Sequence, residues 1–379
     1  MYTQEQKNWA KAMLSRCEEK LCAVLPEIRK DYAYSTANGK YDDFETAPFS
    51  WTCGFFGGLL WLLYQQTGKE SYKARAMQCA ERLDQMLGDP ESFSDLDSHD
   101  MGFMFIPTNV ASYKLTGDLR ARNRALHAAV LLSGRFNING RYIRAWKKGI
   151  MSEENQGYAI IDCLMNLPLL YWAAEEYDDP RFAHIAKAYA ETVRREFVRP
   201  DGSVHHIVEF DPQTGAVRGY PRGQGYASGT TWSRGQAWGI YGFTLSYKYT
   251  KDAALLEAAK GVADCVMKRI EPGKLPKLDY DQPSMPDYRD ASAAAGMASG
   301  LMELAKYCGE EGKRYADFAF ELLQSLVPHC DFSVENQAIV QNCSEKYHTN
   351  RHHIPLIYAD YFLVEALMKC VAEKDPQMW

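Results

Sequence analysis

Two aspartates are the residues of this sequence best suited to acid–base chemistry. Asp162 lies in an almost entirely apolar run that extends from Ala159 to Ala173, and Asp100 lies in the segment SHDMGFMF. A carboxylate removed from water must be paired, hydrogen-bonded or protonated, because its charged form loses hydration. Asp162 therefore either pins a neighbouring segment or exchanges a proton. Asp100 also has two interpretations, because aspartate is a good N-cap at the start of a helix.

Together the two acids suggest glycosidic chemistry. If one acid lies within an apolar segment and the other at the edge of the same site, one can donate a proton while the other stays charged. Trp51, Trp232 and Trp238 offer flat faces on which a sugar ring could stack, although tryptophans also fill cores. Two acids beside aromatic faces are typical of a glycosidase.

Basic side chains near these segments are candidates for binding an anion. Arg234, in TTWSRGQAWG, suits a carboxylate or a sulfate, but it is equally suited to a buried salt bridge. His205 and His206 lie on a predicted strand, where alternation turns only one of them inward. His348 and His352 have i,i+4 spacing, but no HExxH motif or nearby carboxylate accompanies them. We predict neither a metal site nor a nucleotide cofactor, because P-loop and dinucleotide-binding motifs are lacking as well.

Paired helices are predicted to position these residues. Hydrophobic periodicity predicts about twelve helices, in which a strongly apolar helix, a short polar turn and an amphipathic helix recur. The segment from Asn155 to Ala173 is predicted to be one buried helix that carries Asp162. A β-hairpin is predicted from Ser203 to Val217, and the two ends of the chain, near residues 3 to 29 and 354 to 373, form the sixth helix pair. Tight turns are expected at Gly68, Gly117, Asp178, Lys251 and Gly309.

This pattern predicts an all-α fold, an (α/α)6 barrel with an inner and an outer ring of helices and a small β-hairpin insertion. The barrel is expected to be one catalytic domain, residues 1–379, and an open α-solenoid is the alternative. Tight turns close one end of such a barrel, so the longer loops that enter the inner helices meet at the other end. The candidate acids and tryptophans belong to these loops. Helix N-termini at that end also favour an anionic ligand.

Composition and charge exclude several classes of partner. The formal net charge is −6, and Lys and Arg form no stripe along a predicted helix, so nucleic acid is not an expected partner. The first residues lack a basic region followed by an apolar run, and no apolar stretch is long enough to span a bilayer. We therefore expect a cytoplasmic protein without a membrane partner. The ten cysteines form no close CxxC pairs, which indicates reduced thiols rather than disulfides or zinc ligands.

Five segments of the chain resemble one known family. They are SHDMGFMF, DCLMNLPLLYWA, HIVEFDPQTG, QGYASGTTWSRGQAWGIYGF and DASAAAGMASGLMEL. Their order and spacing over almost the whole chain are similar to those of the unsaturated glucuronyl hydrolases, glycoside hydrolase family 88. The resemblance implies an (α/α)6 barrel that needs no metal. It also implies a small anionic substrate, the disaccharide that a polysaccharide lyase leaves with a 4,5-unsaturated uronic acid at its non-reducing end.

Roles for individual residues follow from the same resemblance. Asp162 matches the general acid and base, and Asp100 matches the second essential carboxylate. The positions that match the family's substrate site are Trp51, His206, Gln224, Arg234 and Trp238. The implied reaction is a hydration: the acid protonates C4 of the vinyl ether, and a water activated by the same carboxylate adds at C5. The resulting hemiketal opens and releases the other sugar.

One departure from the family concerns sulfated substrates. Family members that favour them carry a Ser and Lys motif near the C-terminus, and the corresponding stretch here reads QNCSEK. Ser344 and Lys346 match the motif, whereas Gln341 replaces a serine. The sequence therefore leaves open the preference for sulfate, the glycosidic linkage and the oligomeric state.

Three other functions are compatible with the sequence. An unsaturated rhamnogalacturonyl hydrolase would share the barrel and the chemistry but act on pectin fragments. An inverting glycosidase on saturated substrates would hold Asp100 and Asp162 across a scissile bond, with carboxyl groups roughly 6.5 to 9.5 Å apart. A non-catalytic sugar-binding toroid would lack convergent acids at its open end.

Overall fold

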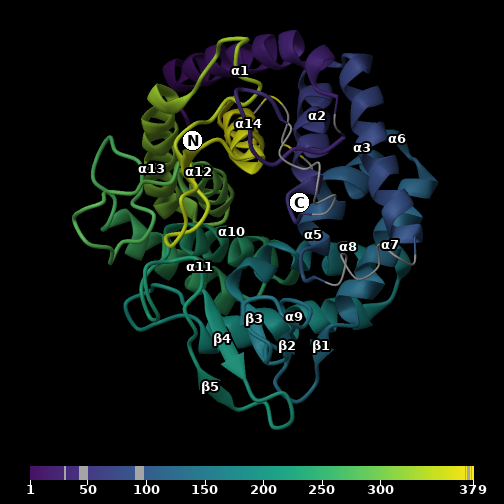
Figure 1. Cartoon of the computed structure of the whole chain (residues 1–379), viewed down its shortest axis with the longest axis vertical. Helices are drawn as coiled ribbons and strands as arrows, with labels where there is room; N and C mark the ends of the chain where they lie inside the picture. The colour runs from purple at the N-terminus through teal and green to yellow at the C-terminus, as the bar shows by residue number, and fades with distance from the viewer. Residues whose placement is uncertain (30, 42–49, 90–97, 372, 374–375, 377) are drawn as a thin grey trace.

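Two concentric rings of helices make up most of the molecule (Figure 1). The computed structural model describes residues 1–379 except 30, 42–49, 90–97, 372, 374–375 and 377. The inner ring consists of α2 (Cys53–Thr67), α5 (Met101–Phe105), α6 (Ala111–Thr116), α8 (Leu167–Tyr177), α10 (Ser233–Thr250), α12 (Ala291–Ala305) and α14 (Ile357–Val371). A π-helical turn, η2 (Ile106–Val110), joins α5 to α6. The outer ring consists of α1 (Gln4–Val24), α3 (Glu70–Gly88), α7 (Leu119–Ser133), α9 (Pro180–Glu196), α11 (Ala253–Met267) and α13 (Gly312–Leu326).

The two rings differ in how much of each helix is buried. Every residue of α12 and of α14 is buried, because other helices surround these inner helices. In the outer helix α13, buried residues recur at helical spacing, as at Tyr315, Ala319 and Leu322, so only one face meets the core. This difference matches the predicted alternation of apolar and amphipathic helices.

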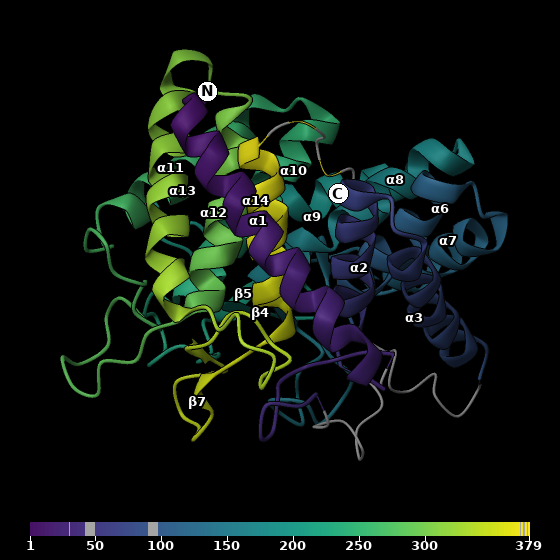
Figure 2. The ribbon, with the colours of Figure 1, turned by 90° about the horizontal axis from the view of Figure 1, so that it is seen from above.

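The inner ring is closed. Around the ring, α5 contacts α2 and α8, α10 contacts α8 and α12, and α14 packs against both α12 and α2. The N-terminal helix α1 covers α14 from outside (Figures 1 and 2). The predicted (α/α)6 barrel is thus confirmed, and the open solenoid is wrong.

Tight turns at one end join each inner helix to the outer helix that follows. α2, α6, α8 and α10 end at Gly68, Gly117, Asp178 and Lys251, with φ of 71°, 76°, 51° and 57°. Each of these left-handed residues donates its amide to the carbonyl four residues earlier, which closes the helix. Gly309, with φ of 54°, lies in the turn between α12 and α13. All five predicted turns are confirmed, and the longer connections gather at the opposite end, here called the open end (Figure 2).

Short strands lie on the longer connections. β3 (Tyr158–Ile160), β4 (Ile207–Phe210) and β5 (Val217–Gly219) form one antiparallel sheet. The predicted hairpin is confirmed as β4 and β5, and the Gly215 amide donates to the Asp211 carbonyl (2.8 Å) in its turn. Strand β3 is not part of the sequence prediction. The other strand pairs are β1 (Phe136–Asn137) with β2 (Tyr142–Ile143) and β6 (Cys343–Ser344) with β7 (His352–Ile354).

The predicted single helix from Asn155 to Ala173 is wrong. Its first part forms β3, a 3₁₀ turn called η3 (Ile161–Met165) follows, and α8 begins only at Leu167. Pairing with β4 holds β3 extended. Pro168 lies in the first turn of α8, where its missing amide costs least, whereas a helix running through it would lose a hydrogen bond. Asp162 therefore lies on a tight turn that leads into an inner helix.

Two general properties of the molecule bear on its chemistry. The ten cysteines are all free thiols. None of the helices in the described part of the chain has the length and apolar character needed to cross a membrane.

Candidate active site

The pairing of β3 with β4 brings Asp162 and His206 together. Ile160 in β3 lies opposite Ile207 in β4, and the amide of Ile161 donates to the carbonyl of His206 (3.0 Å). Because the two strands are antiparallel, the chain that leaves β3 lies beside the chain that enters β4. Asp162, just after β3, is therefore close to His206, just before β4. His206 Nε2 lies 3.5 Å from Asp162 Oδ1, and both residues are 8% exposed.

The ring of His206 is fixed in one tautomer. Its Nδ1 accepts a hydrogen bond from the amide of Gln224 (3.0 Å), and an amide can only donate, so Nδ1 carries no proton. The proton of the neutral imidazole is therefore on Nε2, the atom that faces Asp162. Gly223 passes so close to this ring that a Cβ there would lie 1.6 Å from Nδ1. The loop that carries Gln224 thus holds an N–H donor toward the acid.

The Asp162 carboxylate has no structural hydrogen bond. Its Oδ1 is buried and has no hydrogen-bond partner among the described residues. Other buried acids of the described chain are occupied: Asp290 pairs with Arg234, and Asp360 accepts from two backbone amides. A buried acid without a structural partner is a candidate for a chemical role. The interpretation that Asp162 only pins a neighbouring segment is therefore not supported.

The carboxylate of Asp100 is bound by the side chains of the two residues that precede it. Ser98 Oγ donates to Asp100 Oδ2 (2.6 Å), and His99 Nε2 lies 3.1 Å from Oδ1. Although Asp100 stands at the N-cap position of α5, its side chain makes no capping hydrogen bond. Capping therefore does not explain this aspartate. The residue is 8% exposed, as is Asp162.

The starts of α5 and α8 are in direct contact, which brings the two acids into one region. The Phe103 amide donates to Asn166 Oδ1 (2.7 Å), and a Cβ added to Gly102 would lie 2.4 Å from the Asn166 Cα. The pKa of His99 is sensitive to both acids. Burial lowers this pKa, but the charges of the two carboxylates, Asp100 first, raise it more, so the net shift is upward.

Trp51 and Trp238 lie at different depths. Trp51 is partly exposed, and its ring packs against those of Phe103 and Tyr358, at centroid distances of 5.3 and 4.8 Å. Trp238 has no exposed surface and lies 5.3 Å from Phe103 and 5.6 Å from Phe362. Trp51 therefore retains a surface that a sugar could meet, whereas Trp238 packs in the layer beneath it.

Trp232 separates the histidine from the arginine of the site. Its ring centroid lies 4.3 Å from that of His206 and 4.7 Å from the guanidinium carbon of Arg234. It is 2% exposed, and its backbone forms an isolated antiparallel bridge with Asp279. Trp232 is thus a buried spacer rather than an open stacking surface.

Arg234 forms the buried salt bridge that was one of its two sequence interpretations. The guanidinium pairs with Asp290, and Nη1 also donates to the Ser344 carbonyl (2.8 Å). Nη2 donates to Gln224 Oε1 (2.8 Å) and to the carbonyl of Glu345. Both terminal nitrogens are thus used within the protein, and the residue is 2% exposed. Arg234 ties the loop that carries Gln224 to the C-terminal QNCSEK segment.

The QNCSEK segment presents one exposed cation. Gln341 turns into its own loop, where Nε2 donates to the Ala338 carbonyl (3.1 Å). Ser344 is fully buried, and its hydroxyl donates to the Arg289 carbonyl (2.8 Å). Lys346 is exposed. The structure therefore does not support a sulfate contact by Ser344, because its hydroxyl is buried and hydrogen-bonded within the protein. Lys346 remains as the candidate for binding a sulfate.

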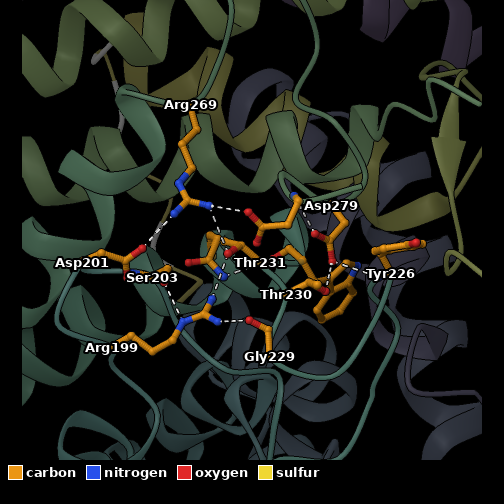
Figure 3. Close-up of polar contacts among 12 residues, drawn as sticks. Arg199, Asp201, Ser203, Tyr226, Gly229, Thr230, Thr231, Arg269 and Asp279 are labelled. Carbon is orange, nitrogen blue, oxygen red and sulfur yellow. Dashed lines mark hydrogen bonds and ion pairs between the residues drawn. The ribbon is translucent and has the colours of Figure 1, made fainter. Parts of the chain in front are cut away.

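A polar network beside the site fixes the loop from 224 to 232 (Figure 3). Asp279 accepts from a backbone amide (2.9 Å) and a threonine hydroxyl (2.7 Å) of this loop. Arg199 Nη2 and Arg269 Nη1 both donate to Thr231 Oγ1, at 2.9 and 3.2 Å. The loop thus has little freedom to move Gln224 or the indole of Trp232, because its contacts come from three separate segments.

Sequence reasoning assigned no role to His99, Ser98 or Tyr358. The position of His99 directly before Asp100 was a usable signal, because neighbouring acid and imidazole groups commonly pair. Tyr358 gave no signal, because it lies within the apolar helix α14 and reaches Trp51 only through closure of the barrel.

The described residues contain no group of three or more His, Cys, Asp or Glu side chains arranged to hold a metal ion. His348 Nε2 is instead hydrogen-bonded to the Tyr226 carbonyl (2.6 Å). His352 stacks on Tyr288, with 3.6 Å between ring centroids. The two histidines with i,i+4 spacing therefore serve different contacts.

A closed six-hairpin barrel with two neighbouring buried carboxylates, one of them facing a fixed imidazole, defines a six-hairpin glycosidase. Comparison with known proteins identifies the family. The chain belongs to Glycosyl Hydrolase Family 88, whose model matches residues 27–370.

Individual relatives agree with this assignment. The chain is 39% identical over 332 residues to an unsaturated glucuronyl hydrolase of Bacillus sp. (strain GL1), covering 84% of this chain and 85% of the relative. A crystal structure of unsaturated glucuronyl hydrolase from Bacillus sp. GL1, responsible for the degradation of glycosaminoglycan, is 33% identical with a TM-score of 0.89 and covers 98% of each chain. A mutant of the Streptococcus agalactiae unsaturated glucuronyl hydrolase, complexed with dGlcA-GalNAc6S, is 26% identical with a TM-score of 0.80, covering 97% of this chain and 93% of that one.

Proposed function

We propose that this protein is an unsaturated glucuronyl hydrolase, which removes the 4,5-unsaturated uronic acid from the non-reducing end of lyase-generated glycosaminoglycan disaccharides. The observation that carries the proposal is the buried Asp162 carboxylate, which receives no hydrogen bond from the described residues. The substrate class is supported by relatives named for glucuronyl hydrolysis and by the disaccharide bound in one of them.

In the proposed reaction, Asp162 acts first as an acid and then as a base. Its proton adds to C4 of the vinyl ether, and positive charge develops at C5 and the ring oxygen. The carboxylate then takes a proton from a water molecule, whose oxygen bonds to C5. Ring opening turns C5 into a ketone and C1 into a hemiacetal, which releases the second sugar. A positioned acid–base group of this kind is worth roughly 10² to 10⁴ in rate.

His206 and Asp100 assist this cycle in different ways. His206 directs an N–H toward Asp162 Oδ1 at 3.5 Å, so it steadies the carboxylate after the proton has left. Asp100 accepts a hydrogen bond from Ser98 and lies beside His99, which suits an anion that stays charged. A fixed negative charge near C5 stabilises the positive charge of the transition state.

Trp51 and Gln224 are the proposed direct contacts with the sugar. Trp51 keeps an exposed surface, and sugar rings pack well on flat aromatic faces. Gln224 is partly exposed, and because its Oε1 accepts from Arg234, its NH₂ group is left to donate to a substrate oxygen. Arg234 and Trp238 act from beneath, by holding these groups in place.

Lys346 is the proposed contact with a sulfate on the second sugar. It is exposed and lies one residue from Glu345, whose carbonyl is fixed by Arg234. A lysine ammonium on a backbone segment that Arg234 ties to the site can pair with an anion on the neighbouring sugar. Sulfated disaccharides are therefore expected to bind more tightly than unsulfated ones.

The proposal also includes one catalytic domain, residues 1–379, in the cytoplasm. Ten free thiols, most of them buried, suit a reducing compartment.

The test is loss of the near-ultraviolet absorbance of the C4=C5 bond. Unsaturated disaccharides from chondroitin, hyaluronan and heparin are each incubated with the protein, without added metal or nucleotide. An unsaturated rhamnogalacturonan disaccharide serves as one control. A saturated chondroitin disaccharide serves as the other, and its cleavage is followed by chromatography of the released sugars because it has no C4=C5 bond. We expect absorbance loss with at least one glycosaminoglycan disaccharide. Turnover of the saturated or the rhamnogalacturonan substrate alone would overturn the proposal.

A further inference from the structure

We propose that His99 is a positioning residue of this site: an imidazolium clamped between the Ala145 carbonyl and the Asp100 carboxylate, which keeps Asp100 ionised and correctly oriented. This inference rests on the proposed function of Asp100. If Asp100 stays charged throughout the reaction, Asp162 is the acid of this pair that exchanges a proton.

The contacts of the ring determine where its protons are. The His99 side chain is buried, and Nδ1 lies 2.7 Å from the Ala145 carbonyl oxygen. A carbonyl oxygen only accepts, so Nδ1 must carry a proton. Nε2 lies 3.1 Å from Asp100 Oδ1. Nε2 is buried and has no hydrogen-bond partner among the described residues, so the carboxylate at 3.1 Å is the group that its charge state must suit. A neutral ring with its proton on Nδ1 would leave the Nε2 lone pair beside this carboxylate, whereas a second proton on Nε2 makes the contact attractive.

This second proton belongs to the imidazole. Asp100 Oδ2 already accepts from Ser98 Oγ (2.6 Å), a bond that favours the charged form of the carboxylate. Burial lowers the pKa of His99, but the charges of Asp100 and then Asp162 raise it by a larger amount, so the net shift of the pKa is upward. The pair is therefore an imidazolium and a carboxylate rather than two neutral groups.

Few other groups can change this balance. Apart from Asp100 on its own segment, Asp162 on η3 is the acidic group among the described residues that raises the pKa of His99, and it favours the imidazolium whenever it has given up its proton. Cys163, the next residue on η3, is a neutral thiol because burial raises its pKa well above the usual value. Trp146 meets the ring edge-on at 6.0 Å and carries no charge.

The clamp also sets the distance between the two acid-bearing segments. The His99 amide donates to the same Ala145 carbonyl (3.0 Å), and the Ala145 amide donates to the Tyr158 carbonyl (2.8 Å). Tyr158 begins β3, which leads directly to Asp162. The short backbone segment 144–146 thus connects the segment of Asp100 to the segment of Asp162. His99 binds this connecting segment through both its backbone amide and its side chain.

The first experiment reads the charge of the ring directly and does not depend on activity. The nine histidines are labelled with ¹⁵N, and the His99 signals are assigned by their loss in His99→Gln. At pH 6.5 we expect both ring nitrogens of His99 to be protonated. In Asp100→Asn, which removes the paired charge, most of the second proton should be lost. A singly protonated His99 in the wild-type protein would overturn the inference.

The second experiment uses the pH profile of kcat/KM on an unsaturated chondroitin disaccharide. His99→Gln keeps a neutral donor near Asp100, and His99→Asn keeps one near the Ala145 carbonyl, but neither carries a charge. In both variants we expect the acid limb to move to higher pH by about one unit or more, because the positive charge beside the carboxylate is lost. His99→Gln should keep more activity at neutral pH than His99→Asn.

The matched control is His205→Gln. His205 stacks on Tyr220 at 4.0 Å, as expected from the alternation that turns only His206 inward, and burial lowers its pKa to about 4. Its replacement should leave the acid limb in place. An unshifted acid limb in both His99 variants would contradict the positioning role. A wild-type protein that consumes no unsaturated disaccharide would refute the proposed function instead, and the charge of His99 would still be tested by the labelled spectrum.

Discussion

Replacing Asp162 by asparagine is expected to remove turnover while leaving the fold as stable as before. The amide has nearly the shape of the carboxylate but cannot exchange the proton, so kcat should fall by roughly 10² to 10⁴. That range corresponds to a rise in the activation free energy of about 2.7 to 5.5 kcal/mol.

The expected change in stability comes from the surroundings of the side chain. Asp162 receives no hydrogen bond from the described residues, and the donor closest to it, His206 Nε2, is 3.5 Å away. Little is therefore lost when the carboxyl group is replaced by an amide, because no hydrogen bond from the described part of the protein is broken. The free energy of unfolding should change by less than about 1 kcal/mol.

Asp290→Asn is the matched control, because it removes an acid of similar burial that has a structural partner. Asp290 pairs with Arg234, which is 2% exposed, so the variant leaves a buried cation without its counter-charge. Such a loss costs about 3 to 5 kcal/mol. With about 2.1 cal/mol/K of unfolding entropy per residue, the chain has about 0.8 kcal/mol/K in total, so Tm should fall by about 4 to 6 °C.

The two variants are compared by calorimetry and by absorbance loss with an unsaturated chondroitin disaccharide. Asp162→Asn should lose turnover and keep its Tm to within about 1 °C. The reasoning fails if this variant retains a tenth of the wild-type kcat, or if its Tm falls as far as that of Asp290→Asn. Either result would make Asp162 a structural residue.

Three further predictions test other parts of the structure. Lys346→Ala should raise KM for sulfated chondroitin disaccharides and leave unsulfated ones nearly unchanged, because a contact with the sulfate alone is lost; equal losses of kcat/KM on both would contradict this. Trp379→Ala should lower the free energy of unfolding by about 3 to 5 kcal/mol, because the indole is buried against Phe362 and donates to Glu365; a chemical denaturation curve that does not move would refute it. Burial raises the pKa of Asp360 to about 6, above the roughly 3.9 expected in the unfolded chain. Its contribution to stability is therefore present below about pH 4 and is lost as the pH rises through about 6. Asp360→Asn should flatten the fall in Tm between those pH values, and an unchanged slope would count against the assignment.

The sequence alone was sufficient for the helical architecture. Helix pairs are visible because the signal is local: each apolar helix carries its hydrophobic residues all round, and each outer helix carries them on one face. The turns were equally clear, because Gly68 and Gly117 mark positions where the backbone needs a left-handed conformation. Alternation over a few residues was enough for the β4–β5 hairpin.

The sequence was misleading where a local pattern competed with pairing between distant segments. The run from Asn155 to Ala173 is apolar enough for a helix, yet its first part is a strand, because β4 supplies backbone partners from about fifty residues further along the chain. Periodicity within one segment cannot report a partner that lies in another.

The identity of the candidate acids was also available from the sequence, but their roles were not. Asp162, Asp290 and Asp360 are all buried aspartates at or near the start of an inner helix, and nothing in their immediate neighbours separates them. Tertiary structure makes the distinction. Arg234 comes from another helix to pair with Asp290, and backbone amides of a distant loop reach Asp360, whereas none of the described residues makes such a bond to Asp162. Whether a buried carboxylate is structural or reactive depends on the donors around it, and in this barrel those donors come from other segments of the chain.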